Sequence, residues 1–254
     1  MLQAGLEQAL ARRLRYVTPG GALTHVSTYL GSNKMEWLAQ GLAAPTAQSL
    51  AGQPMAYLVE QAPGATVDAH FHAVDQFQLF VAGSGRIGTH TVRALTVHYA
   101  GAFSPYGPIA AGDQGLSYVT LRRDWDPGAQ WMPAAAPVLR ALPERRHVAY
   151  TTEPLDLDVL DGGSGTAVQW RELAVTGHAG SAQWCRAAAG QCVVADPSGS
   201  AGQFWYVLAG SLVDAQGRQQ QRGGCLFMAA DQPPEPVRAG AAGAQFLQLR
   251  FPLS

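Results

Sequence analysis

Many short stretches of this chain alternate between apolar and polar residues, and glycine-containing turns separate them. In residues 76–82, QFQLFVA, the side chains of Phe77, Leu79 and Val81 share one face of an extended strand, because residues two apart point the same way. Two glutamines and Phe80 share the other face. A strand that is apolar on one face and mixed on the other predicts a barrel wall whose polar face lines a cavity.

The same alternation predicts strands along most of the chain. In the first half they fall at residues 55–64, 66–72, 76–82, 85–89, 91–99 and 116–123, and in the second half at 147–151, 167–174, 182–187, 191–195, 203–209, 224–228 and 244–250. Many short strands at regular spacing predict an all-β sandwich or barrel.

The N-terminus has a different periodicity. In MLQAGLEQALARRLRYV the leucines at positions 2, 6, 10 and 14 recur at helical spacing, which predicts an amphipathic helix that packs as a cap on the first barrel. Charged residues interrupt its apolar face, so we do not expect a signal peptide or a membrane anchor.

A compositional break divides the chain. Residues 125–146, WDPGAQWMPAAAPVLRALPERR, are rich in Pro and Ala, and we expect them to link an N-terminal domain at 1–124 to a C-terminal domain at 147–254. Trp125 and Trp131 border this linker, and we expect them to seal a domain interface rather than to contact a substrate.

The two halves repeat each other. QFQLFVAGS at 76–84 matches QFWYVLAGS at 203–211, and GLSYVTLR at 115–122 matches GAQFLQLR at 243–250, at nearly the same offset. A shared offset indicates one duplicated unit. In the second copy both faces of the strand at 203–209 are apolar, which predicts that this half is built for packing.

Two histidines carry the strongest chemical signal. His70 and His72 are two residues apart on a predicted strand, so both imidazoles can face one metal ion. Gln76 follows after a short turn and can add a carbonyl oxygen, and Gly64 and Gly83 frame the whole segment.

This glycine-framed segment resembles the first motif of the cupin superfamily, Gly-x5-His-x-His-x3-Glu-x6-Gly, with Gln76 in place of the Glu. The second copy has Asp196 and Ser198 at the histidine positions, and serine is a poor ligand for a divalent metal. The resemblance covers most of the chain. It implies a bicupin, with two double-stranded β-helix (jelly-roll) barrels in tandem and a degenerate second domain.

Cupins usually take a further histidine ligand from a second motif, Gly-x5-Pro-x-Gly-x2-His-x3-Asn. Here Pro105 and Gly107 are retained, but the expected histidine is Ala110. Tyr106 lies between them, where the family places residues that line the barrel mouth. It is the candidate catalytic residue, as a hydrogen-bond donor or as an acid or base. The alternative is that Tyr106 only packs beside the prolines.

Other candidates have alternatives as well. Gln76 can be a metal ligand or only a hydrogen-bond partner. His98 is a possible third imidazole, but its parity predicts that it leaves the buried face of its strand. We expect His90, beside a turn, to face solvent or to bond to the backbone. Arg122 and Arg250 end equivalent strands of both copies, which favours a structural role for both.

Composition excludes several classes of protein. The 254 residues are 47% hydrophobic and 14% charged, with a formal net charge of −1 and Lys34 as the only lysine. No basic stripe indicates nucleic-acid binding, and no apolar run is long enough to span a bilayer. Three cysteines without ligand spacing predict reduced thiols in the cytoplasm.

The resemblance implies a metal-dependent enzyme, a dioxygenase, isomerase or lyase, acting on a small oxygen-rich molecule. His70, His72 and Gln76 would hold Fe, Mn, Ni or Zn. Because this set has no carboxylate, we expect an anionic ligand to be attracted to the ion. The rival hypothesis is a metal-free or non-catalytic protein that binds a small molecule directly. Barrel-to-barrel pairing is common in cupins, so a homodimer is possible.

Overall fold

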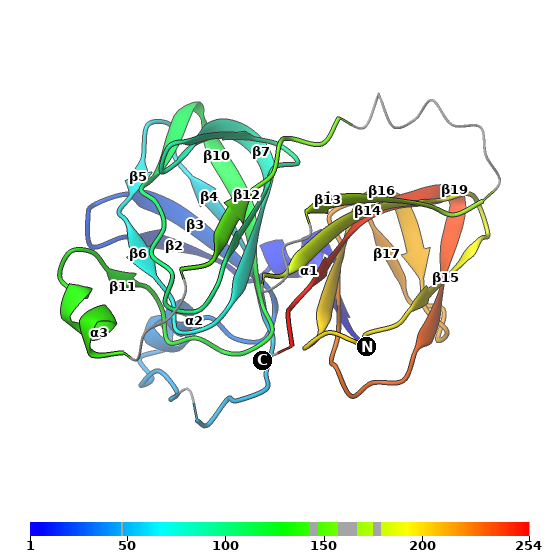
Figure 1. The fold of residues 1–254 in the computed structure, drawn as a ribbon, viewed down its shortest axis with the longest axis horizontal. Helices are drawn as coiled ribbons and strands as arrows, with labels where there is room; N and C mark the ends of the chain where they lie inside the picture. Colours follow the sequence, from blue (N-terminus) through cyan, green and yellow to red (C-terminus); the bar gives the residue numbers. More distant parts are fainter. Residues whose placement is uncertain (47, 143–146, 157–166, 175–178, 254) are drawn as a thin grey trace. The chain divides into compact units, whose positions relative to one another are not determined.

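The computed structural model describes residues 1–46, 48–142, 147–156, 167–174 and 179–253. Strands dominate this part of the chain, as the sequence predicts, and they form two compact units (Figure 1). One unit comprises Leu10–Leu155, and the other comprises Met1–Ala9 with Asp156–Ser254. The all-β fold class is confirmed.

The N-terminal unit is built around one long antiparallel sheet. Its strands run in the order β12-β9-β7-β10-β4-β3-β2, with β5 paired to β10 and β8 paired to β7, while β6 and β11 form a separate pair. The elements are β2 (Arg13–Val17), β3 (Leu23–Leu30), α2 (Lys34–Ala39), β4 (Met55–Gln61), β5 (Thr66–Val67), β6 (His70–Phe71), β7 (Gln76–Ile87), β8 (His90–Arg93), β9 (Val97–Ala100), β10 (Ile109–Arg122), β11 (Gln130–Trp131), α3 (Ala136–Ala141) and β12 (Ala149–Thr151).

The C-terminal unit repeats this plan. Its strand order is β1-β18-β16-β19-β14-β13, with β15 paired to β19 and β17 paired to β16. The elements are β1 (Leu2–Ala4), α1 (Leu6–Leu10), β13 (Gln169–Ala174), β14 (Ser181–Ala187), β15 (Cys192–Ala195), β16 (Gln203–Val213), β17 (Gln219–Gln221), β18 (Cys225–Met228) and β19 (Glu235–Arg250).

The long N-terminal helix predicted from the leucine spacing is wrong. Only Leu6–Leu10 is helical, because Gly5 interrupts the pattern before it and RLRYV at 13–17 alternates as a strand. The first residues form β1, which pairs antiparallel with β18. Residues 1–9 therefore belong to the C-terminal unit rather than to a cap on the first barrel.

The predicted linker at 125–146 is also wrong in its described part. Trp125 and Asp126 are buried, and β11 pairs with β6 inside the N-terminal unit. Residues 143–146 lie outside the described residues. Because β12 pairs with β9, the N-terminal unit continues to Leu155, beyond the predicted boundary at 124. The proline- and alanine-rich segment belongs to the N-terminal unit, and its composition alone does not distinguish it from a linker.

The duplication is visible in the strand register. Gln78 pairs with His98 across β7 and β9, and Trp205 pairs with Leu226 across β16 and β18 at the equivalent position. The glycine of the shared AGS segment, inside β7 and β16, is required for the same steric reason in each unit. Gly83 has a φ of +74°, and a Cβ there would collide with the carbonyl oxygen of Gly115, which only glycine avoids.

The two units differ in the side chains that fill their interiors. In the C-terminal unit, Trp205 stacks on Phe246 with ring centroids 4.4 Å apart, inside a core that also contains Leu226 and Met228. Both faces of β16 are buried there, as predicted. In the N-terminal unit the equivalent of Trp205 is Gln78, which is also buried. One barrel is therefore packed with apolar rings where the other is polar.

None of the helices in the described residues is long and apolar enough to cross a bilayer.

Candidate ligand-binding site

A cavity of about 290 Å³ opens into the N-terminal barrel. This volume lies at the small end of the range for ligand pockets, roughly 300–1,000 Å³. His70 and His72 both line it, as do apolar, aromatic and hydroxyl side chains from β2 to β5, from α2 and from the 127–131 segment. The two rings are perpendicular, with centroids 5.2 Å apart. The prediction that both imidazoles face one cavity is therefore met by the geometry.

His70 is fixed at both ring nitrogens. Its backbone bridges that of Tyr106, with two N–H···O bonds of 3.0 and 3.1 Å. Its Nδ1 lies 2.7 Å from the carbonyl oxygen of Asp68, which can only accept, so Nδ1 carries the proton. The hydroxyl of Tyr106 therefore donates to Nε2 of His70, at 2.7 Å.

His72 is held by a buried carboxylate. Its Nδ1 donates to Oδ1 of Asp126 at 2.7 Å. Asp126 also accepts from the backbone N–H groups of Gly128, at 2.8 Å, and Ala73, at 3.1 Å. Asp126 is 1% exposed, so these bonds replace the water that an ionised carboxylate needs. Because the proton of His72 is on Nδ1, its Nε2 is unprotonated and can accept a hydrogen bond.

Arg122 completes the network. Its Nε and Nη2 donate to Oε1 of Gln76 at 3.1 and 2.8 Å. Its Nη1 lies 3.6 Å from Oδ1 of Asp126, and its guanidinium lies 5.5 Å from the ring centre of Tyr57. Arg122 is 2% exposed, so a cation and an anion are buried together beneath the cavity.

The electrostatics keep both imidazoles neutral. Burial, and then the neighbouring His72, lower the pKa of His70 to about 3, while burial and then the Arg122 guanidinium lower the pKa of His72 to about 4. Burial alone would raise the pKa of Asp126, but Arg122 and His72 outweigh it, so this pKa is lowered. At neutral pH the His72–Asp126 contact is therefore a hydrogen bond to a carboxylate and not an ion pair.

The predicted metal ligands His70, His72 and Gln76 do not fit a three-ligand centre as they are arranged here. The carbonyl oxygen of Gln76 accepts twice from the Arg122 cation, and Nε2 of His70 accepts from Tyr106. Among the described residues, no group of three His, Cys, Asp or Glu side chains could hold a metal. The two imidazoles remain candidate nitrogen donors, and metal binding by them stays a prediction.

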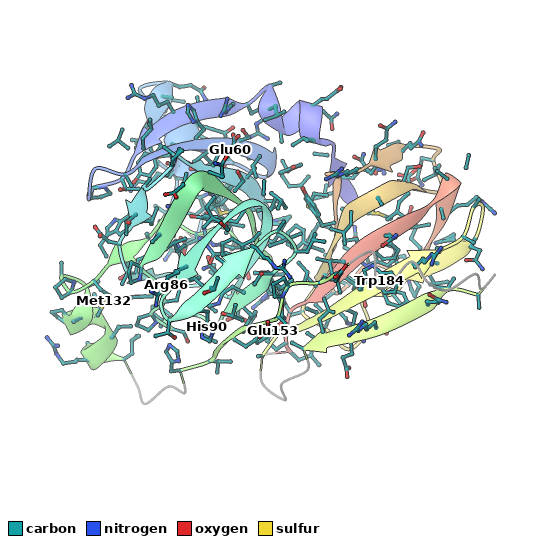
Figure 2. The ribbon with its side chains drawn as sticks, turned by 90° about the horizontal axis from the view of Figure 1, so that it is seen from above. Glu60, Arg86, His90, Met132, Glu153 and Trp184 are labelled. Carbon is teal, nitrogen blue, oxygen red and sulfur yellow. The ribbon has the colours of Figure 1, made fainter. Side chains whose placement is uncertain are left out.

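Tyr106 is bonded to His70 and is not among the residues that line the cavity. Burial raises the pKa of its hydroxyl, so at neutral pH it is a hydrogen-bond donor and not a base. Its contacts include a hydrogen bond to His70 beyond packing, and a catalytic role for Tyr106 stays a prediction. His90 is exposed, as predicted (Figure 2).

His98 contradicts its prediction. It is 4% exposed, its ring centre lies 5.3 Å from that of Tyr106, and its Nδ1 lies 2.9 Å from Oγ1 of Thr151. Its parity is opposite to that of Val97 and Tyr99, as expected, but the face opposite them is the barrel interior. Both faces of β9 are buried.

Sequence reasoning missed three residues of the site. The match with Arg250 favours a structural role for Arg122, and the composition of residues 125–146 places Asp126 and Trp131 in a linker. Trp131 lies 5.0 Å from His70 by ring centres and lines the cavity. The i,i+4 spacing of Arg122 and Asp126 at the end of a strand was the one available signal.

The C-terminal barrel has no comparable site in its described residues. Asp196 accepts from the backbone N–H of Ser198 at 2.9 Å, which is a local turn contact. The buried Gln203 accepts from Gln248 at 2.7 Å and donates to Sδ of Met228 at 3.8 Å, so both ends of its amide have partners inside the barrel. The degenerate second domain predicted from the sequence is thus a packed one.

Together, the two duplicated jelly-roll units, one with a cavity and one packed, define a two-barrel cupin architecture. No family model matches the sequence, and no curated protein matches it.

Solved structures share this fold. A formate complex of Lactobacillus farciminis oxalate decarboxylase superposes with a TM-score of 0.59 at 15% identity, covering 100% of this chain and 87% of that one. A putative dioxygenase from Nostoc punctiforme gives 0.59 at 10% identity, covering 96% and 80%. Bacillus subtilis oxalate decarboxylase, studied for its Mn(II) centres, gives 0.54 at 12% identity, covering 99% and 77%. At these identities the likeness shows the fold, and the chain has a bicupin fold.

Proposed function

We propose that the N-terminal barrel binds a small, oxygen-bearing organic molecule directly, through the neutral imidazole of His72, which lines its cavity. The contrast between the duplicated barrels carries this proposal. The interior positions of Gln78 and His98 are occupied by Trp205 and Leu226 in the second copy. Buried polar groups destabilise a fold unless they are satisfied, so a barrel that needed only to be stable would be filled as the second one is.

The hydrogen bond between Asp126 and His72 determines which polar group the ligand must present to His72. Asp126 fixes the proton of His72 on Nδ1, so Nε2 accepts a hydrogen bond. Its lowered pKa means that Nε2 remains an acceptor across the physiological range. A ligand hydroxyl or N–H group is the complement of such an acceptor. The apolar walls of the cavity, including Val26, Val59 and Trp131, suit a largely apolar ligand body.

A metal-dependent enzyme is the second candidate function, and one observation favours it. Histidines that bind metals usually donate their other ring N–H to a carbonyl or carboxylate, as His70 does to Asp68 and His72 does to Asp126. A divalent Fe, Mn, Ni or Zn ion held there would supply Lewis-acid polarisation of a ligand oxygen. The engagement of Gln76 by Arg122 counts against this candidate.

Elemental analysis of protein purified without a histidine tag distinguishes the two candidates. The comparison is with the double variant His70→Ala/His72→Ala, and Asp196→Ala at the equivalent position of the second copy is the control. Direct binding predicts no stoichiometric metal in any of the three proteins. Stoichiometric metal in the wild type and in Asp196→Ala, lost in the double variant, would contradict direct binding and establish the metal site.

A further inference from the structure

Lys34, the only lysine of the chain, lines the same cavity as His72. It is the first residue of α2, and the segment before it is fixed by Asn33. The side chain of Asn33 accepts from the N–H of Met35 at 2.9 Å, while its own N–H donates to Glu36 at 2.8 Å. This reciprocal capping holds the backbone at Lys34 in place.

The stem of Lys34 lies over Gly128. A Cβ built on Gly128 would be 3.9 Å from Cδ of Lys34, in ordinary van der Waals contact. Gly128 lines the cavity and donates its N–H to the Asp126 carboxylate that holds His72. Lys34 and His72 therefore line one cavity, and each contacts the 126–128 segment.

The charge of Lys34 is not balanced within the protein. Among the described residues, no carboxylate lies within ion-pair distance of it, and none lines the cavity. The nearby Glu36 is bound by Arg12 at 2.9 Å. The negative charge of Asp126 faces Arg122. Lys34 is exposed, so it adds one unbalanced positive charge to the solvent-facing part of the cavity lining, and this charge attracts an anion.

We infer that the cavity selects a compact hydroxy-carboxylic acid, whose carboxylate pairs with Lys34 and whose hydroxyl donates to His72. This inference rests on the proposed function and extends it, because direct binding by His72 leaves the charge of the ligand open. The apolar residues Val26, Val59 and Leu38 line the cavity and suit the hydrocarbon part of such a ligand. A neutral amide of the same shape would lose the pairing with Lys34.

Four probes of nearly equal size separate the two contacts: 4-hydroxybenzoate, 4-hydroxybenzamide, benzoate and benzamide. Calorimetric titration of the wild-type protein should show 4-hydroxybenzoate binding most tightly. Loss of the negative charge or of the hydroxyl should each weaken binding about tenfold, as expected for one hydrogen bond that involves a charged group or a buried acceptor. In Lys34→Met, 4-hydroxybenzoate should lose about tenfold in affinity, and 4-hydroxybenzamide should be unchanged.

Arg93→Met is the matched control, because it removes one positive charge from an exposed position on β8 of the same barrel. It should leave all four affinities unchanged. Reductive methylation with 13C-formaldehyde labels only Lys34 and the α-amino group of Met1. The Lys34 signal should shift saturably with 4-hydroxybenzoate, and the Met1 signal, in the other unit, should not.

The outcomes separate this inference from the proposed function. Equal binding of 4-hydroxybenzoate and 4-hydroxybenzamide, or equal losses in Lys34→Met and Arg93→Met, would overturn the role of Lys34 while leaving direct binding by His72 intact. Equal binding of 4-hydroxybenzoate and benzoate would overturn the hydroxyl contact. Failure of all four probes to bind the wild type would overturn the ligand class, and the elemental analysis would then judge the proposed function on its own.

Discussion

Replacing Asp126 by Asn tests the buried network under the cavity most severely. The substitution keeps the shape of the side chain but removes the charge that faces Arg122 at 3.6 Å. One amide oxygen can still accept from His72 and Gly128. The new NH2 group then faces the backbone N–H of Ala73, where the carboxylate accepts at 3.1 Å. A donor is placed against a donor inside the protein.

The expected loss follows from these contacts. Breaking a buried ion pair by removing one partner costs about 3–5 kcal/mol, because the other charge is left uncompensated. The unsatisfied N–H of Ala73 adds about 1–3 kcal/mol. Arg122 keeps its bonds to Gln76 and its contact with Tyr57, which offset part of the loss. We therefore expect Asp126→Asn to lower the free energy of unfolding of the N-terminal barrel by about 3 kcal/mol or more.

Urea unfolding followed by tryptophan fluorescence and far-UV circular dichroism measures this loss. The two units can unfold in separate transitions, so the midpoint that belongs to the N-terminal barrel is the relevant one. Asp124→Asn is the matched control. Asp124 is 28% exposed and pairs with Arg123, which is 32% exposed, so its loss should be below about 1 kcal/mol. Equal, small effects of the two substitutions would refute the buried network.

Three further predictions test the same account. The usual pKa of a histidine in the unfolded chain is about 6.5, whereas buried His70 and His72 stay neutral down to about pH 4. As the pH is lowered from about 6.5 to about 4, the unfolded chain therefore binds more protons than the folded one, and the free energy of unfolding should fall by up to about 1.4 kcal/mol per pH unit for each histidine. Urea midpoints across this range check the slope, and a flat profile would contradict neutral burial. Tyr106→Phe leaves the buried Nε2 of His70 without its donor and should destabilise the N-terminal barrel by about 1–3 kcal/mol; an unchanged midpoint would show that this bond is absent. Trp205→Ala should destabilise the C-terminal barrel by about 3–5 kcal/mol without changing probe binding to the N-terminal cavity, and thermal unfolding with calorimetry checks both.

The cupin motif predicted much of the N-terminal barrel because its signals are local. The two-residue spacing of His70 and His72 places both rings on one face, and the glycine at 83 is required by a backbone conformation that other residues avoid. Duplication predicted the second barrel for the same reason, since matched strands keep a matched register.

The rest of the site depends on contacts between distant parts of the chain, which no local pattern records. Asp126 and Trp131 reach the cavity only because β11 returns to pair with β6, and the composition of that segment resembles a linker. Strand parity alone misplaces His98, because both faces of β9 are buried and a residue opposite Val97 and Tyr99 is still inside the barrel. Local spacing could not show that Gln76 accepts from Arg122, because the two residues are 46 positions apart.

Nitrogen-15 NMR of the histidine side chains tests the central claim most directly, because ring-nitrogen shifts report which atoms hold protons. The chain has seven histidines, and His70→Ala and His72→Ala assign the two that matter. Our account predicts that both are neutral, with the proton on Nδ1, throughout the range from about pH 5 to 8. A doubly protonated ring, or a proton on Nε2 of either residue, would contradict it.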